Sequence, residues 1–229
     1  DEVTVIVTTP AGCSETVTLT MVENGVSGGT PTAATASTTI CSGAVPASIT
    51  VTGSTVSGTV SYRWQESPDN ITFTNITGIL GSSATLTPTT GITTTTYYRR
   101  LTISTLNGVA CEEASTSAIV NVTPVPTGNL QAVIAGGTTV TAPVTLTICP
   151  GEEVTFTGSG GTTYEFLVGP TVVQARSASN TYVTTALLNN DVVTMNVYSA
   201  TGSCTAVSNP VTITYAGNPA VTLSSDAPA

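Results

Sequence analysis

The sequence predicts an all-β fold, built from tandem β-sandwich modules that are arranged end to end without significant helix. Threonine and valine supply 50 and 28 of the 229 residues, and β-branched side chains fit pleated strands better than helices. Short strand patterns recur at a spacing of about 8 to 12 residues, which is typical of sandwiches. Hairpin patterns with one cysteine each also recur, which indicates that one architecture is repeated.

Each predicted strand alternates apolar and polar residues or is rich in β-branched residues, and turn residues bound it. The alternation predicts an apolar inner face and a threonine-rich outer face. After a hairpin within 1–21, the strands predicted for the middle of the chain are 49–52, 59–65, 71–74, 84–87, 96–103 and 117–123. Those predicted for the last part are 145–148, 153–158, 163–168, 172–177, 182–184, 192–199 and 210–215.

Three segments share one hairpin plan, in which an alternating strand, a glycine-containing turn and one cysteine precede a second alternating strand. A second repeated motif, Cys-x-Gly before a strand, begins at Cys41 and at Cys149. The three hairpin segments are 1–21 with Cys13, 97–122 with Cys111, and 191–215 with Cys204.

These repeats divide the chain into modules. Residues 1–24 read as the C-terminal strands of a truncated preceding module, and 25–124 as a complete sandwich. Residues 125–216 form a second complete sandwich, and 217–229 begin the next module or a linker. The Pro/Gly segments between modules are too short for flexible tethers, so the modules are expected to follow each other directly.

Five cysteines are an odd number, and the repeat accounts for it. Pairing within modules predicts disulfides between Cys41 and Cys111 and between Cys149 and Cys204. Cys13 is left unpaired through truncation, because its partner would belong to the missing part of its module. Each loop would stabilise its module by roughly 4 kcal/mol in the chain-entropy model and implies an oxidising compartment. A metal cluster is disfavoured, since the chain has no histidine and no C-x-x-C spacing.

The charge content excludes several classes of function. The chain has four arginines, no lysine and no histidine, and its net charge is −9. This composition therefore excludes histidine-based catalysis, lysine Schiff bases and a Walker-type phosphate site. Nucleic acid is not an expected partner, since binding it depends largely on Lys and Arg neutralising phosphates.

The positive mean hydropathy of +0.31 reflects few charges and many valines. No apolar run approaches the roughly 18 residues that a spanning helix requires, so membrane insertion is not expected. The sequence opens inside a strand pattern without a signal-peptide pattern, and any export signal is expected to have been removed or to lie elsewhere. An extracellular, cell-surface location is predicted.

Two runs of sequence resemble a known family. The run SYRWQESPDNITFTNITG, with TLTPTTGITTTTYYRRLTIS after it, resembles immunoglobulin-like repeats of very long secreted surface proteins in gliding bacteria. The run ICPGEEVTFTGSGGTTYEFLVG resembles the PKD-like repeats of the same proteins. The resemblance implies SprB-like adhesins that leave the cell by type IX secretion and act in gliding, with outer-membrane export and anchoring machinery as partners. Given their places in the modules, the disulfides are expected to clip one end of each sandwich.

Several single residues invite both a structural and a functional interpretation. Trp64, the only tryptophan, alternates with apolar neighbours and is predicted to be a core aromatic, with a sugar-stacking surface as the alternative role. Tyr97 and Tyr98 begin a long strand and are given structural roles. Arg99 and Arg100 are consecutive, so they should project to opposite faces, and one is expected to pair with an acid such as Glu66.

Acidic pairs raise the question of glycoside hydrolysis, which requires two carboxyl groups around one bond. Adjacent strand residues diverge, however, and neither pair lies near an evident cleft, so no catalytic residue is assigned. The same acids could supply oxygens to calcium at module junctions, but no calcium-loop spacing is present and solvated loops are favoured. The residues concerned are Glu112, Glu113, Glu152, Glu153, Asp69, Asn189, Asn190 and Asp191.

The sequence therefore predicts a non-enzymatic structural and adhesive segment of a long surface filament, with no cofactor. Carbohydrate-binding accessory modules of a secreted polysaccharide-active protein are the alternative. Self-association through exposed strand edges is a third hypothesis. Exposed coplanar aromatics around Trp64 would favour the alternative.

Overall fold

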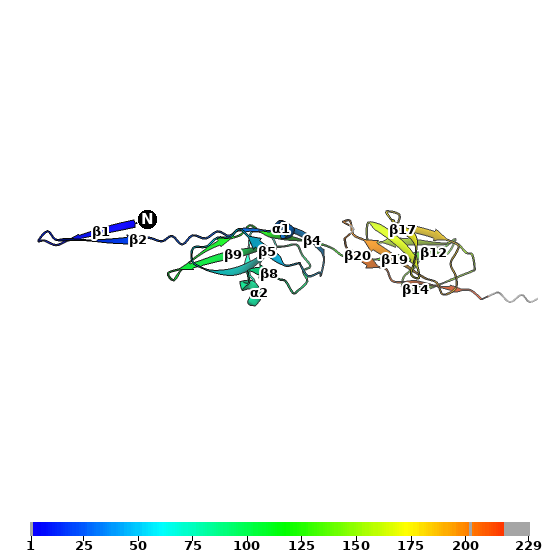
Figure 1. Cartoon of the computed structure of the whole chain (residues 1–229). Coiled ribbons are helices and arrows are strands. Elements are labelled where there is room, and N and C mark those ends of the chain that lie inside the picture. The colour runs from blue at the N-terminus through cyan, green and yellow to red at the C-terminus, as the bar shows by residue number, and fades with distance from the viewer. Residues whose placement is uncertain (1, 202, 218–229) are drawn as a thin grey trace, which may run out of the picture. The chain divides into compact units, whose positions relative to one another are not determined.

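The computed structural model describes residues 2–201 and 203–217, and they are almost entirely β-structure. Twenty-one strands are interrupted only by two four-residue helices, α1 (Ala33–Ala36) and α2 (Ile79–Ser82), within these residues. The chain divides into two compact units, Asp1–Val122 and Thr123–Ala229, whose strands run from blue to green and from green to orange in Figure 1. No helix among the described residues is long and apolar enough to cross a membrane.

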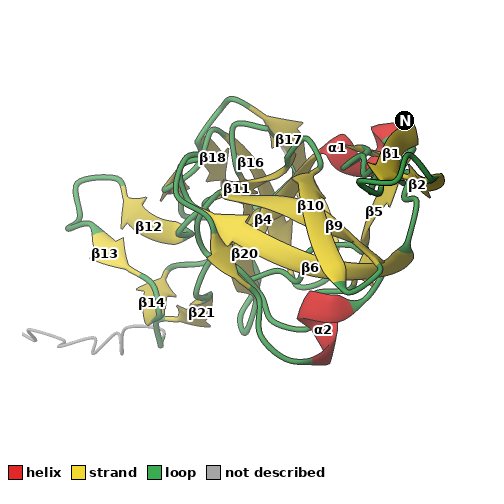
Figure 2. Cartoon of the chain, turned by 90° about the vertical axis from the view of Figure 1, so that its left-hand side faces the viewer, coloured by secondary structure: helices red, strands yellow, loops and turns green. Residues whose placement is uncertain are grey.

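The first unit contains a β-sandwich. Its larger sheet has the order β4-β11-β9-β6-β7, with β10 paired to β9, and its smaller sheet has the order β3-β5-β8. Figure 2 shows the long strands β6, β9 and β10 side by side. The larger sheet consists of β4 (Ser37–Cys41), β11 (Ala118–Thr123), β9 (Thr96–Leu106), β6 (Thr59–Ser67), β7 (Thr74–Asn75) and β10 (Val109–Ala114). The smaller sheet consists of β3 (Thr30–Pro31), β5 (Ile49–Thr52) and β8 (Thr85–Leu86).

The second unit is also a two-sheet sandwich. Its larger sheet has the order β14-β21-β19-β16-β17 with β20 on β19, and its smaller sheet has the order β13-β12-β15-β18. The larger sheet consists of β14 (Val144–Ile148), β21 (Val211–Tyr215), β19 (Val192–Tyr198), β16 (Thr163–Val168), β17 (Thr171–Ser177) and β20 (Thr205–Val207). The smaller sheet consists of β13 (Val140–Thr141), β12 (Asn129–Ile134), β15 (Val154–Ser159) and β18 (Thr181–Thr184).

The two units repeat one strand plan. When strands are counted from β4 in the first unit and from β14 in the second, the first, eighth, sixth, third and fourth strands follow one another across the larger sheet in both units, and the seventh pairs with the sixth. Two sheets of this size over one core in about 100 residues form an immunoglobulin-like sandwich. The prediction of tandem immunoglobulin-like β-sandwiches is therefore confirmed.

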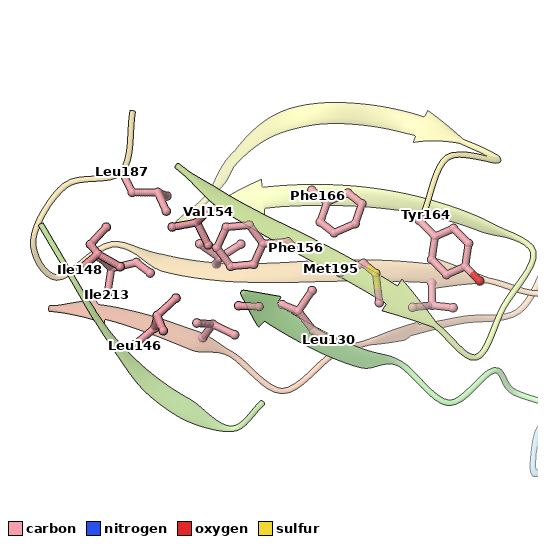
Figure 3. Packing of buried hydrophobic residues seen from close by; sticks show 14 residues of the cluster. Leu130, Leu146, Ile148, Val154, Phe156, Tyr164, Phe166, Leu187, Met195 and Ile213 are labelled. Carbon is pink, nitrogen blue, oxygen red and sulfur yellow. The ribbon is translucent and has the colours of Figure 1, made fainter. Parts of the chain in front are cut away.

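Each unit has a core of its own, filled by the inner faces of both sheets. In the first unit Trp64 and Tyr98 of the larger sheet pack with Ile49 and Leu86 of the smaller one. In the second unit Phe156 and Phe166 face each other across the layers with Met195 beside them, as Figure 3 shows. Alternation along the strands explains this packing, because every second residue points inward.

Residues 2–20 form a hairpin that belongs to none of the sandwich sheets. Strand β1 (Glu2–Thr8) pairs only with β2 (Ser14–Thr20), in an unbroken antiparallel register from Glu2–Thr20 to Thr8–Ser14. Every residue of both strands is exposed. The first residue held by the sandwich is Asn24, whose Nδ2 donates to the carbonyl oxygens of Ser104 and Val109 at 3.0 and 2.9 Å.

Most predicted strands exist, and the differences lie at sheet edges and at β12, an inner strand of the second unit that was not predicted. The predicted strand 49–52 coincides with β5, whereas 71–74 is mostly loop and only Thr74 lies in β7. The short strands β3 and β4 at the edges of the first sandwich were not predicted. The start of a further module that the sequence predicts in 217–229 lies outside the described residues, apart from residue 217.

Candidate functional site

Trp64 lies in the core and not on a binding surface. Strand β6 lies between β9 and β7 in the larger sheet, and its inward face buries the indole completely, with 0% exposure. The indole Nε1 donates to the carbonyl oxygen of Ser83 at 2.8 Å, so the polar atom of the ring is satisfied inside the protein. Trp64 therefore has no free face on which a sugar could stack.

Arg99 and Arg100 project to opposite faces of β9, as adjacent strand residues must. On the outer face, Arg99 Nε donates to Gln65 Oε1 at 2.8 Å, and the guanidinium lies 3.8 Å from the centroid of the Phe73 ring. Gln65 in turn donates to Asn75 Oδ1 at 2.8 Å, which joins β6 and β7. Arg99 thus anchors the edge of the sheet by stacking and hydrogen bonding.

Arg100 is buried, with 3% of its surface exposed. Its guanidinium donates to the Ala84 carbonyl oxygen at 2.8 Å and to Ser54 Oγ at 2.9 Å, and lies 4.3 Å from the Tyr62 ring centroid. Burial lowers the pKa of this guanidinium.

Neither neighbouring arginine pairs with an acid. Within the described residues, the ion pair that the structure forms joins Arg63 to Glu112, so the predicted pairing of Arg99 or Arg100 with an acid such as Glu66 is wrong. The guanidinium groups instead contact the rings of Phe73 and Tyr62 and neutral oxygen atoms of Gln65, Ala84 and Ser54.

The second unit carries a comparable polar cluster on β16, β17 and β19. Glu165 Oε2 accepts hydrogen bonds from Asn196 Nδ2 at 2.7 Å and from the Tyr198 hydroxyl at 3.2 Å. The Arg176 guanidinium lies 3.9 Å from the centroid of the Tyr198 ring. Desolvation and the Glu165 charge raise the pKa of Tyr198, so this hydroxyl is a structural hydrogen-bond donor at neutral pH.

The carboxylate pairs do not form catalytic dyads. Glu112 and Glu113 are consecutive in β10 and so point to opposite faces, with Glu112 in the ion pair to Arg63 at 3.0 Å. Both side chains of that pair are nearly half exposed, so the pair contributes little to stability. Glu152 Oε2 instead accepts the backbone N–H of Cys149 at 2.8 Å, which holds the turn after β14.

The carboxylate oxygens that could have bound calcium accept hydrogen bonds within turns instead. Asp69 Oδ1 accepts hydrogen bonds from the Ser67 hydroxyl at 2.8 Å and from the backbone N–H groups of Ile71 and Thr72, each at 2.9 Å. The hydrogen bond from Thr72, followed by that from Ile71, holds the pKa of Asp69 below its usual value. Asp191 Oδ2 accepts the N–H of Leu188 at 2.8 Å in a separate turn.

Asn189 Oδ1 accepts the N–H of Tyr215 at 2.8 Å, and Asn190 has a φ of 70° in the same turn. Among the described residues, no group of three or more Cys, Asp or Glu side chains is placed to hold a metal ion. These side chains shape loops in this fold.

The cysteines differ from the expected pattern. Cys41 and Cys204 are disulfide-bonded, whereas Cys13, Cys111 and Cys149 are free thiols. The two pairs predicted within modules, Cys41 with Cys111 and Cys149 with Cys204, are therefore not formed in this structure. Repeat spacing shows which cysteines belong to one module, but it does not show which sulfur atoms come within bonding distance.

A shallow groove lies on the second unit. Its volume is about 470 Å³, and it is lined by 123–127, 160–162, Ser199 and Ala200. The lining contains no Asp, Glu, Arg or Cys side chain, so it offers hydroxyls, prolines and backbone atoms. The side chains that line this groove include none that could act as a general acid or base beside those hydroxyls.

The most unusual surface is one face of the β1–β2 hairpin. The register puts Val3 opposite Leu19 and Val5 opposite Val17, so that these four side chains share a face with Val7. Their exposed fractions run from 43% for Val3 to 60% for Val7. The apolar face of this hairpin is uncovered, although its alternation is that of a sandwich strand.

The corresponding face of the second unit is fully covered. Val193, Met195 and Val197 of β19 are 0% exposed, and Val193 lies opposite Val211 just as Val5 lies opposite Val17. The smaller sheet of the sandwich provides this cover. The sequence shows the alternating pattern of β1 and β2, but it does not show that their apolar face is exposed.

Comparison with known proteins gives a limited result. The model of a domain of unknown function, DUF8696, matches residues 30–124, which is less than half of the chain. No curated protein matches the sequence. Among solved structures, the N-terminal four Ig domains of Dscam1 are similar: isoforms 6.9, 8.4 and 9.44 share 12%, 13% and 11% identity with this chain, each with a TM-score of 0.34.

The match covers 90%, 90% and 88% of this chain and 52%, 52% and 51% of those structures, so the chain spans about half of their length. Likeness at this level assigns no function. The immunoglobulin-like fold is assigned here from the strand order and the two cores of the chain itself.

Proposed function

We propose that this chain is a non-enzymatic structural and adhesive segment of a longer repetitive protein. One observation carries the proposal: the strand order of the larger sheet is the same in both units. In each unit the side chains of the two sheets fill the space between them. The polar side chains of each cluster form hydrogen bonds within that cluster. Repeated sandwiches of this kind can extend a protein and present its surface.

The topology of the second unit suits a load-bearing role. Strands β14 and β21 are parallel neighbours, in register from Val144–Val211 to Ile148–Tyr215. A force that pulls the start of β14 away from the end of β21 acts along both strands, so it must break several backbone hydrogen bonds together. In the first unit β6 and β9 share nine consecutive pairs, from Thr59–Thr105 to Ser67–Tyr97, which hold the centre of the sheet.

The surface chemistry agrees with exposure to an aqueous medium without strong charge. Only 7% of residues are charged, and threonine fills many outward positions. Thr147 and Thr214 illustrate this, since their hydroxyls bond across β14 and β21 at 3.0 Å. Such pairs stabilise a sheet and keep its outer face polar.

The location, the transport route and the partners are part of the proposal. Immunoglobulin-like sandwiches, a disulfide and the absence of a membrane-spanning helix in the described residues support an extracellular location. The resemblance to SprB-like adhesins supports type IX secretion, surface attachment in gliding and contact with outer-membrane anchoring machinery. Residues 1–24 are proposed to complete a further module, since their apolar face has the pattern that the second unit buries.

The carbohydrate-binding alternative loses its main support. It required Trp64 on a solvent-exposed face together with tyrosines, and Trp64 is fully buried. Saturable binding of one glycan class on an array, lost after substitutions in the groove at 123–127 but with unfolding unchanged, would restore that alternative.

Single-molecule force spectroscopy tests the structural role. The chain should be pulled from its ends under reducing conditions, so that no disulfide shortens the length that is released. Two discrete unfolding events are expected, each releasing about 30 nm for a module of about 95 residues. Smooth extension without discrete events would contradict a load-bearing segment. Beads coated with the chain should also stay on glass or polysaccharide under flow longer than beads coated with an unrelated acidic protein.

A further inference from the structure

Two of the free cysteines occupy the same places as the two bonded ones. Cys41 ends β4 and Cys149 directly follows β14, and these strands hold the same edge position in the two larger sheets. In both, the backbone N–H three residues later donates to the cysteine carbonyl oxygen, at 2.9 and 3.1 Å. The glycine two residues later has a positive φ in each case, 84° at Gly43 and 79° at Gly151. Cys41 and Cys149 are thus the same structural position in two modules.

Cys13 and Cys204 form a second equivalent pair. The N–H of Cys13 donates to the Thr9 hydroxyl, and the N–H of Cys204 donates to the Ser199 hydroxyl, both at 3.2 Å. The N–H of Thr9 returns a bond to the carbonyl oxygen of Cys13, as that of Ser199 does to Cys204, both at 2.9 Å. Each cysteine comes directly before the second strand of its hairpin, β2 or β20.

What differs between the equivalent positions is the state of the sulfur. The disulfide-bonded residues are one of each type, Cys41 at the end of an edge strand and Cys204 in a hairpin turn. Cys149 and Cys13 are the free residues of the same two types, and both are exposed. The equivalent turns therefore place their cysteines at the same backbone position in each module.

We propose that Cys149 and Cys13 are linking cysteines, which join this segment covalently to neighbouring modules. An edge-strand cysteine of the Cys149 type bonds to a hairpin cysteine of the Cys13 type in another copy of the module. This inference rests on the proposed function as a repetitive segment and extends it, since the links would fasten successive modules against extension. The partner is therefore a second cysteine-bearing immunoglobulin-like module.

The bond forms by ordinary thiol–disulfide exchange with a disulfide oxidant such as oxidised glutathione. The thiolate of one cysteine attacks the glutathione disulfide and releases one reduced glutathione. The second thiolate then attacks the mixed disulfide, which releases a second reduced glutathione and leaves the protein disulfide. Two thiols lose two protons and two electrons, and one oxidant molecule takes them up.

Cys111 provides a matched control within the chain. It is a free thiol but lies inside β10, directly opposite Ser104 of β9, and not in a turn of the Cys204 kind. It is half-buried, whereas Cys13 and Cys149 are exposed. Substitution of Cys111 removes a thiol without removing a proposed link.

The test oxidises the purified chain with a mixture of oxidised and reduced glutathione and separates the products on non-reducing gels. The unsubstituted chain should give a ladder of covalent oligomers that disappears with a reductant. Cys149→Ser and Cys13→Ser should each reduce the oligomers to the level seen without oxidant, and Cys111→Ser should keep the ladder. Peptide mapping by mass spectrometry should find the Cys13–Cys149 linkage more often than random pairing of three thiols would give.

Three results would overturn the proposal: no oligomers above the unoxidised level, a ladder that survives Cys149→Ser, or linkages dominated by Cys111 or by identical cysteines. Circular dichroism of each variant shows whether it retains its fold. Loss of the ladder with two intact unfolding events under force would reject the links and leave the structural role standing. Loss of those events would reject the structural role itself.

Discussion

The single tryptophan allows one unit to be tested apart from the other. Trp64 belongs to the core of the first unit, and the core of the second contains none of the same residues. Trp64→Ala would remove a side chain that is 0% exposed, together with the hydrogen bond from Nε1 to Ser83. Large-to-small changes of a buried aromatic cost about 3–5 kcal/mol, because transfer and cavity terms add.

The expected shift is large and confined to one transition. For a domain of about 100 residues, 1 kcal/mol moves the melting temperature by about 4–8 °C, so Trp64→Ala should lower one transition by at least about 12 °C. Trp64→Phe keeps most of the apolar volume but loses the hydrogen bond and leaves the Ser83 carbonyl oxygen unpaired. Its expected cost is about 1–3 kcal/mol, smaller than that of Trp64→Ala.

Thermal unfolding followed by far-UV circular dichroism measures both transitions, and tryptophan emission of the unsubstituted protein identifies which one belongs to the first unit. Phe166→Ala is the control, since Phe166 is also 0% exposed but lies in the second core. It should lower the other transition by a similar amount. A Trp64→Ala protein whose stability changes by less than about 0.5 kcal/mol, or whose two transitions fall together, would refute the assignment of separate cores.

Three further outcomes are expected. Because hydrogen bonds depress the pKa of Asp69, its stabilising effect is complete above its unfolded pKa of about 3.9 and is lost as the pH falls through the folded value. Urea unfolding between pH 2 and 7 should show that Asp69→Asn is less stable than the unsubstituted protein at neutral pH and equally stable in acid. A stability difference that stays constant with pH would contradict this. Alkylation of the native protein without reductant, followed by mass spectrometry, should label Cys13 and Cys149 quickly and Cys111 more slowly. A disulfide-linked Cys41–Cys111 or Cys149–Cys204 peptide would instead show that the cysteines pair within modules. Gly160→Ala should destabilise the second unit by about 1–3 kcal/mol in urea unfolding, since Gly160 has a φ of 97° and a Cβ there would meet the Thr127 carbonyl oxygen. The control Gly169→Ala, at a φ of 56° in open space, should cost about 1 kcal/mol. Equal effects of the two substitutions would show that the close approach to Thr127 is unimportant.

The fold was predictable from sequence where alternation was long and one face was apolar. Val154, Phe156 and Gly158 alternate toward the core, and the strand predicted at 153–158 differs from β15 by one residue at each end. Edge strands were missed or misplaced because their pairing is short and depends on loops: the hydrogen bonds to Asp69 convert 71–73 into a turn.

The candidate sites were less predictable, since side-chain partners come from strands that are distant in sequence. That Arg99 and Arg100 face opposite ways follows from their being adjacent. That Arg99 stacks on Phe73 and Arg100 on Tyr62 depends on the register between β6, β7 and β9, which no local pattern contains. The disulfide pairing could not be predicted for the same reason, because the length of a loop does not determine where its two sulfur atoms lie.

The exposed hairpin shows most clearly what a local pattern can and cannot determine. Val3, Val5 and Val7 alternate just as Val193, Met195 and Val197 do, yet the first three are 43–60% exposed and the last three are 0% exposed. Both strands have antiparallel neighbours, β2 for β1 and both β20 and β21 for β19, so the pattern is sufficient for a paired strand. Burial depends in addition on a second sheet, which the second unit supplies from β12, β15 and β18. An isolated two-stranded hairpin is marginal in water, so β1 and β2 would gain most of their stability from an apolar sheet of that kind.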